Sequence, residues 1–248
     1  MQQFELKNRT IVITGASSGI GKQCAIHCAE AGASLILLGR NKDRLAEVKK
    51  VLKGDSHRWF SVDLTNLDAL KKSVTEILDD TPVIHGIVHS AGVSLTYPFK
   101  LSKPDKLTSV FQINVNAAFE LTRLLLKGAS DEGMSVVFIT SVMASVGEKA
   151  KSVYSMSKGA LLSGSRSLAL ELAGKNIRVN CVSPGVVDTP MTEDAAYRRN
   201  EKALKSIREK HPLGLGKPEH VANAVQFLLS DAAAGITGID LKVDGGYT

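Results

Sequence analysis

The chain has 248 residues, of which 44% are hydrophobic, 23% charged and 5% aromatic. That length allows a sizeable buried core, and the balance is that of a globular protein, which excludes collagen-like, disordered and disulfide-scaffold classes. The 31 basic and 25 acidic side chains leave a net charge of +6. This excess alone is compatible with a nucleic-acid partner, an anionic ligand or simply a basic surface.

No apolar run reaches the length of a membrane span, and the first residues, MQQFELKNRT, lack the apolar stretch of a signal peptide. We therefore expect a cytoplasmic protein with no membrane partner. No helix-turn-helix, zinc or aromatic-platform signature accompanies the basic charge, so a nucleic-acid partner is not expected either.

Three cysteines, Cys24, Cys28 and Cys181, suggest no disulfide framework. Cys24, His27 and Cys28 share a helix face and could be imagined as metal ligands. No second ligand pair with zinc-like spacing accompanies them, and free cysteines are usually small buried residues. No metal site is predicted.

Short β-branched runs alternate with longer segments of helical period, the order typical of βαβ units around a parallel sheet. Strands are predicted at residues 10–14, 34–38, 58–62, 86–89, 136–140, 177–182 and 239–243. Helices are predicted near 20–31, 42–53, 67–79, 105–128, 153–174, 195–210 and 219–229. The strands are continuously apolar, as in a sheet covered on both faces. We expect a single domain over 1–248, an α/β Rossmann-like doubly wound fold with a seven-stranded parallel sheet flanked by helices.

A glycine-rich turn, TGASSGIG at 14–21, joins the first strand to the first helix. Glycines let the backbone turn sharply and approach a ligand closely, and the amides at a helix N-terminus then face a diphosphate. A plain turn is the alternative, but the position at the start of a βαβ unit favours a dinucleotide. The candidate residues are Gly15, Ser17, Ser18, Gly19, Ile20 and Gly21.

The second strand ends in Gly39 and Arg40, where a NAD-binding chain would carry an acidic residue for the ribose 2′-hydroxyl. A guanidinium can hold a 2′-phosphate through bidentate, charge-assisted bonds. The sequence therefore favours NADP(H) over NAD(H). The alternative is that Arg40 is only a surface cation.

Tyr154 and Lys158 are four residues apart at the start of the helix predicted over 153–174, so they share one face. A phenol with a pKa of about 10 is a poor acid–base group at neutral pH, and an adjacent ammonium lowers that pKa by stabilising the phenolate. Ser141 closes the fifth strand shortly before them. These three residues are candidates for a catalytic group.

One polar residue interrupts an apolar stripe in the helix predicted over 105–128. A buried amide without partners costs about 1–3 kcal/mol, so Asn114 indicates a defined polar network, whether catalytic or purely structural. The stripe consists of Leu107, Phe111, Asn114, Ala118, Leu121 and Leu125.

With these motifs the chain resembles the short-chain dehydrogenase/reductase family over essentially its full length, and within it most closely the 3-oxoacyl-acyl-carrier-protein reductase type. The further matching segments are Asp63-Leu64, Ala91-Gly92, Pro184-Gly185 with Thr189, and the closing Val243-Asp244-Gly245-Gly246. The resemblance implies Tyr154 as proton donor, Lys158 as the residue that lowers its pKa and holds the nicotinamide ribose, Ser141 as the hydroxyl that orients the substrate carbonyl, and Asn114 as the holder of a relay water.

The resemblance also implies the remaining cofactor contacts. Asp63 and Leu64 would lie at the adenine, and Ala91 and Gly92 beneath the adenine ribose. Pro184, Gly185, Val187 and Thr189 would lie along the nicotinamide. One departure is visible: the family usually has Asn-Asn before Ala-Gly, and this chain has His89-Ser90. We expect His89 to be a buried structural histidine rather than a base.

The segment at about 191–215 resembles the family's variable substrate loop, a lid that excludes water when it closes. Its portion over 195–210 is charged and amphipathic, so it does not indicate a steroid pocket. Lys127 and Lys175 correspond to the family's carrier-binding surface, although two ordinary surface lysines are the default interpretation.

The function expected from these features is NADPH-dependent reduction of a small-molecule ketone, with a carrier-linked 3-oxoacyl thioester as one candidate. The alternatives are a dehydrogenase of a sugar, polyol or other secondary alcohol and, more remotely, a noncatalytic nucleotide-sensing protein. Because relatives are usually tetramers or dimers, we expect a homotetramer.

Overall fold

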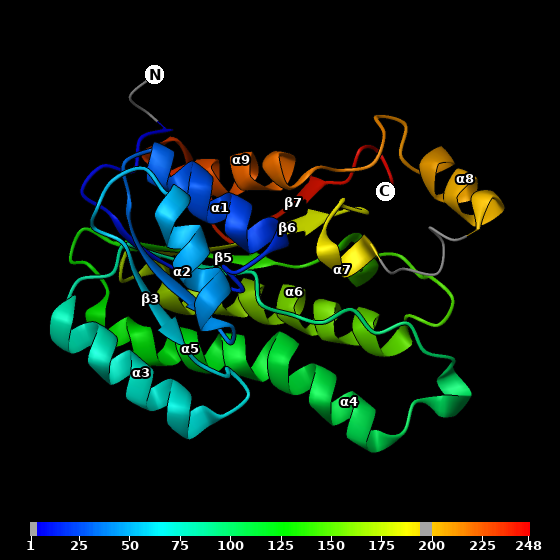
Figure 1. Cartoon of the computed structure of the whole chain (residues 1–248), viewed down its shortest axis with the longest axis horizontal. Coiled ribbons are helices and arrows are strands. Elements are labelled where there is room, and N and C mark those ends of the chain that lie inside the picture. Colours follow the sequence, from blue (N-terminus) through cyan, green and yellow to red (C-terminus); the bar gives the residue numbers. More distant parts are fainter. Residues whose placement is uncertain (1–3, 194–199) are drawn as a thin grey trace.

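The computed structural model describes residues 4–193 and 200–248 (Figure 1). Seven strands form one parallel sheet in the order β3-β2-β1-β4-β5-β6-β7. This confirms the predicted α/β doubly wound fold and its seven-stranded parallel sheet. The strands are β1 Thr10–Thr14, β2 Ser34–Gly39, β3 Arg58–Ser61, β4 Gly86–His89, β5 Met134–Ile139, β6 Ile177–Pro184 and β7 Asp240–Val243.

Helices cover both faces of the sheet (Figure 1). Two clusters of buried apolar side chains form the core. The layer on one face includes side chains of α1, α2 and α9, and the layer on the other includes side chains of α3, α5 and α6. The helices are α1 Gly19–Glu30, α2 Lys42–Val51, α3 Leu67–Asp80, α4 Pro104–Phe111, α5 Ala117–Leu125, α6 Ser152–Ala173, α7 Pro190–Glu193, α8 Glu201–Glu209 and α9 Pro218–Leu229. Each helix of the described residues is too short or too polar to cross a membrane.

The helix predicted over 105–128 is not one regular α-helix. A π-helical turn, Gln112–Asn116, separates α4 from α5, and a short 3₁₀ turn, Leu126–Gly128, ends the element. The wider turn shifts the phase of the apolar stripe, so Leu107 and Phe111 are only half-buried. The rest of the stripe is buried as predicted: Asn114, Ala118, Leu121 and Leu125.

Two further differences lie in the expected substrate loop. A short helix, α7, was not predicted. The helix predicted over 195–210 corresponds to α8, which begins at Glu201, and residues 195–199 of that prediction lie outside the described part of the chain.

The strand order reverses between β1 and β4, which pair in parallel with Thr14 opposite His89. At that point the Thr14 hydroxyl donates to the Val88 carbonyl (3.4 Å) and accepts from the amides of Ser90 (3.1 Å) and Ala91 (3.0 Å). A single side chain thus ties the loop after β4 to the glycine turn after β1. In open α/β sheets such a reversal is where ligands bind.

His89 and Phe138 show how the sheet packs against its covering helices. The two rings stack with centroids 4.7 Å apart, and Phe119 stacks on Phe138 at 5.5 Å. The imidazole Nε2 forms a 2.8 Å hydrogen bond with the Thr122 hydroxyl. Burial lowers the pKa of His89 to about 3, so the ring is neutral. These contacts agree with the prediction of a buried structural histidine.

Phe138 offers a direct test of this packing. We expect Phe138→Ala to lower the free energy of unfolding by about 3–5 kcal/mol, because the side chain is fully buried and its removal leaves a cavity. Phe99→Ala is the matched control, since Phe99 is 79% exposed and its loss should change stability by about 0.5 kcal/mol or less. Urea unfolding followed by circular dichroism measures both, and equal effects would contradict this account of the core.

Candidate active site

The glycine turn between β1 and α1 is pressed against the loop after β4. Gly15 adopts a left-handed backbone with φ of 65°, and a Cβ at this position would lie 2.8 Å from the Ala91 nitrogen. Any other residue would therefore push the two loops apart. The same turn lies near the end of β2, because a Cβ on Gly39 would be 3.6 Å from the Ser17 hydroxyl oxygen.

The first turn of α1 has the features of an anion-binding site. Ser18 is the N-cap, its hydroxyl forms no capping hydrogen bond, and no acidic residue occupies the first turn. The backbone amides of Gly19, Ile20 and Gly21 are the first of the helix, and no preceding turn supplies carbonyl acceptors for them. They suit a diphosphate, since the helix dipole places partial positive charge at the same end.

The segment after β6 reaches the glycine turn from the other side. A Cβ on Gly19 would lie 3.5 Å from Thr189, so the loop at 185–189 approaches the start of α1. Val187 and Thr189 are buried, and the Val187 carbonyl accepts a 2.8 Å hydrogen bond from Thr192. The glycine turn after β1 is therefore in contact with the loops that follow both β4 and β6.

Arg40 and Asp63 lie beside each other at the carboxyl ends of β2 and β3. The Ser61 hydroxyl donates to the Arg40 carbonyl (2.9 Å), which joins these strand ends. Hydrogen bonds from the amide and hydroxyl of Thr65, and to a lesser extent the charge of Arg40, lower the pKa of Asp63. The Arg40 side chain is exposed and Leu64 is buried. β2 and β3 lie on the opposite side of β1 from β5, after which Ser141 comes, so these residues and Ser141 belong to different halves of the sheet.

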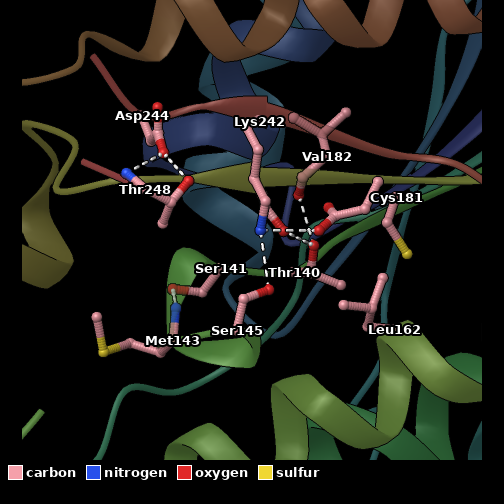
Figure 2. A network of polar contacts seen from close by, with 12 residues as sticks. Thr140, Ser141, Met143, Ser145, Leu162, Cys181, Val182, Lys242, Asp244 and Thr248 are labelled. Atoms are coloured by element: carbon pink, nitrogen blue, oxygen red, sulfur yellow. Dashed lines mark hydrogen bonds and ion pairs between the residues drawn. The ribbon is translucent and has the colours of Figure 1, made fainter. Parts of the chain in front are cut away.

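Tyr154 lies in the first turn of α6 and Ser141 directly follows β5, and the Ser141 hydroxyl is close enough to the phenol to influence its pKa. The Ser141 hydroxyl also accepts from the Met143 amide (3.2 Å), which fixes its direction (Figure 2). Burial raises the pKa of Tyr154 above its ordinary value, and the nearby Ser141 hydroxyl offsets part of this rise. The net shift is opposite to the lowering expected from Lys158, because burial of the phenol dominates. The phenol is therefore protonated at neutral pH.

Lys158 is buried one turn further along α6. Its Nζ donates to the Ile139 carbonyl (2.8 Å) and lies 5.9 Å from the centre of the Tyr154 ring. Burial lowers the pKa of this ammonium from 10.5 to about 8. A Cβ on Gly92 would be 3.6 Å from the same Nζ, so Lys158 borders the loop after β4 as well.

Asn114 is fully partnered at the π turn. Its carbonyl accepts from the Val93 amide (2.8 Å), and its Nδ2 donates to the Val93 carbonyl (3.0 Å) and to the Ser157 hydroxyl (3.0 Å). Ser157 in turn donates to the Tyr154 carbonyl (2.7 Å). Asn114 therefore ties the loop after β4 to the start of α6, which confirms the polar network predicted for it.

The closing motif supports the segment after β6. Asp244 accepts hydrogen bonds from the amide (3.1 Å) and hydroxyl (2.7 Å) of Thr248 (Figure 2). A Cβ on Gly185 would lie 3.0 Å from the Asp244 carbonyl oxygen and 2.7 Å from Nε2 of His211. The segment after β6, which the resemblance assigns to the nicotinamide, therefore packs against the C-terminal residues at Gly185.

Comparisons with known proteins agree with this geometry. A family model described as Enoyl-(Acyl carrier protein) reductase matches residues 15–248. A 3-oxoacyl-[acyl-carrier-protein] reductase, FabG, of Thermotoga maritima is 32% identical over 247 residues, which cover 98% of this chain and 99% of the relative. The chain belongs to the short-chain dehydrogenase/reductase family.

Solved structures of other short-chain dehydrogenases/reductases superpose closely. A candidate short-chain alcohol dehydrogenase of Sinorhizobium meliloti gives a TM-score of 0.92 at 30% identity, covering 99% of this chain and 98% of that one. A candidate NAD(P)-dependent gluconate 5-dehydrogenase of Beutenbergia cavernae, with bound NADP at low occupancy, gives 0.91 at 32% identity over 99% and 98%. The chain is therefore an oxidoreductase by family.

Several residues of this short-chain dehydrogenase/reductase site were not singled out from the sequence. His211 is buried, accepts from the Val186 amide at Nε2 (3.0 Å) and has Nδ1 2.7 Å from the Ile207 carbonyl, which assigns the proton to Nδ1. Ser157 was visible only as part of the Tyr154 motif. Thr14, which joins two strand ends, looks like an ordinary strand residue.

The buried ammonium of Lys158 predicts how stability changes with pH. The unfolded chain keeps this proton up to a pH of about 10.5, whereas the folded chain releases it at about 8, so the cost of burying the charge disappears as pH rises. Below both values that cost is about 3 kcal/mol.

Lys158→Met measures this cost directly. We expect its stability relative to the wild type to be greatest near pH 7 and to decline by roughly 2–3 kcal/mol towards pH 10. Urea unfolding of both proteins at the two pH values gives the difference. A stability difference that does not change with pH would show that Lys158 is not charged and desolvated in the folded protein.

Proposed function

We propose that this short-chain dehydrogenase/reductase reduces a small-molecule ketone to a secondary alcohol with NADPH, and that Tyr154 donates the proton. The observation that carries the proposal is the grouping of the buried Tyr154 phenol with Ser141 and with the buried Lys158 ammonium, which borders the loop packed against the glycine turn. The similarity to a 3-oxoacyl-[acyl-carrier-protein] reductase supports reduction of a carbonyl as the chemistry.

Each residue of the site then has a task in the reaction. The nicotinamide cofactor supplies the hydride when it is bound. Ser141 and Tyr154 orient the substrate carbonyl by hydrogen bonds, and the Tyr154 hydroxyl, protonated at neutral pH, transfers its proton to the oxygen as negative charge develops there. Lys158, fixed by the Ile139 carbonyl, stabilises the resulting phenolate.

NADP(H) is proposed over NAD(H) on the basis of Arg40. This guanidinium is exposed at the end of β2, where a 2′-phosphate would lie, and the neighbouring Asp63 is engaged by Thr65. The remaining cofactor contacts proposed are the glycine turn, Leu64, Ala91-Gly92 and the segment Pro184 to Thr189. The NADP in the Beutenbergia cavernae structure is consistent with this choice.

A dehydrogenase acting on a sugar acid or another secondary alcohol is the second candidate. The similarity to a candidate gluconate 5-dehydrogenase favours it, and the same residues would serve the reverse reaction with Tyr154 as base. A noncatalytic nucleotide-sensing role is disfavoured by the intact set Asn114, Ser141, Tyr154 and Lys158.

Partners and assembly are proposed on the same basis. A carrier-linked substrate would meet the exposed cations Lys127 and Lys175. A homotetramer is proposed because α6 exposes apolar side chains, with Leu170 80% and Met156 51% exposed. A cytoplasmic location fits this chemistry.

Tyr154→Phe tests the proton donor, because it removes one hydroxyl and little volume. We expect turnover to fall by about a hundredfold or more while NADPH binding, followed by fluorescence titration, is retained. The assay is loss of NADPH absorbance with a panel of ketones and 3-oxoacyl thioesters. Near-normal turnover with intact NADPH binding would exclude Tyr154 as the acid.

Arg40→Ala tests the cofactor preference. We expect KM for NADPH to rise about tenfold or more and KM for NADH to stay unchanged, because only NADPH carries the 2′-phosphate. Lys72→Ala, which removes an exposed cation from α3, is the control and should change neither value. An unchanged KM for NADPH in Arg40→Ala would show that Arg40 does not determine the preference for NADPH over NADH.

A further inference from the structure

A second ammonium lies beside Tyr154. Lys151 Nζ is 5.4 Å from the centre of the Tyr154 ring, slightly closer than Lys158 Nζ. Lys151 is only half-buried, and it precedes α6 on the loop that leads from Ser141 to the tyrosine. The proposed proton donor therefore has two cations near its ring.

The backbone around Lys151 is fixed. Ala150 adopts a left-handed conformation with φ of 61°, which is unusual for a residue with a Cβ, and its carbonyl accepts a 2.7 Å hydrogen bond from the Tyr97 amide. Lys151 Nζ donates to the Ser94 hydroxyl at 2.9 Å. Both contacts hold the lysine against the loop after β4, next to Tyr154.

Lys151 has no counter-charge of its own. Its ammonium carries three donors, and within residues 4–193 and 200–248 it forms one hydrogen bond, to a neutral hydroxyl, and no ion pair. Glu148 is the acid whose charge acts on it, and the Glu148 carboxylate is bound by Lys210 at 3.0 Å and lies 3.5 Å from the Tyr247 hydroxyl. Burial lowers the pKa of Lys151, as expected of a cation without a close partner.

The position is also a poor one for a structural lysine. Lys151 is the N-cap of α6, where its side chain forms no capping hydrogen bond and no acidic residue follows in the first turn. A cation at this end of a helix opposes the helix dipole, and serine or aspartate would stabilise the helix better. This loss of helix stability is explained if the Lys151 ammonium binds a ligand instead of stabilising the fold.

We propose that Lys151 binds a carboxylate on the substrate, so that this enzyme prefers a free oxo acid to a neutral ketone or ester with the same reacting carbonyl. The ammonium lies 5.4 Å from the centre of the Tyr154 ring and uses one of its three donors, on Ser94, so two donors are left for a carboxylate near the carbonyl of a ketone bound at Tyr154. The inference rests on the proposed function and names its substrate class. Lys151 acts here as a specificity-determining residue.

The test compares a 3-oxo acid with its methyl ester, which share the reacting carbonyl and differ in charge. We expect Lys151→Gln to lower the acid-to-ester ratio of kcat/KM by about tenfold or more, the effect of losing one charge-assisted hydrogen bond. KM for NADPH should not change, because the lysine faces the substrate. Lys151→Arg should restore most of the ratio.

Lys149→Gln is the matched control, since it removes an exposed lysine two residues away on the same loop and should leave the ratio unchanged. Urea unfolding of each variant verifies that it is folded. A ratio unaffected by Lys151→Gln, or lowered equally by Lys149→Gln, would overturn the inference while ketone reduction stands. Failure of the wild type to oxidise NADPH with either compound, or with any ketone of the panel, would instead contradict the proposed function and the inference with it.

Discussion

Pairing of β1 with β4 is the constraint on which the site depends. β1 lies between β2 and β4, so the chain moves away from the centre of the sheet in opposite directions on the two sides of β1. The loops at the carboxyl ends of β1 and β4 therefore diverge and leave room for a ligand. The Thr14 hydroxyl then binds the amides of Ser90 and Ala91, and Gly15 has no Cβ to hold the loops apart. The glycine turn, the loop after β4 and the segment after β6 meet there for this reason.

Burial gives this site its chemistry. The same low-dielectric surroundings keep the Tyr154 phenol protonated, so that it has a proton to donate, and disfavour the charge on Lys158. Their polar neighbours do not titrate at neutral pH: Ser141 lies near the phenol, and the Ile139 carbonyl accepts a hydrogen bond from the ammonium. Preorganised groups of this kind need little rearrangement during a reaction.

The sequence predicted the sheet well because each strand is a short apolar run with a turn at its end. It predicted the candidate site because residues that follow parallel strands share one edge of the sheet. It failed at Gln112–Asn116, since a π turn adds a residue without changing the composition of the helix. His211 and Lys151 were not found, because their partners, Val186, Ser94 and the Tyr154 ring, are determined by loop conformations rather than by periodicity.

Hydrogen–deuterium exchange with and without NADP⁺ tests the central claim, that the loops at the carboxyl ends of β1, β2, β4 and β6 form one dinucleotide site. It needs no substrate and reports backbone amides directly. The account predicts that NADP⁺ slows exchange in peptides covering 14–21, 39–41, 90–93 and 184–189, and leaves the turns at 53–57 and 174–176, at the opposite edge of the sheet, unchanged. No protection, or protection confined to that opposite edge, would contradict it.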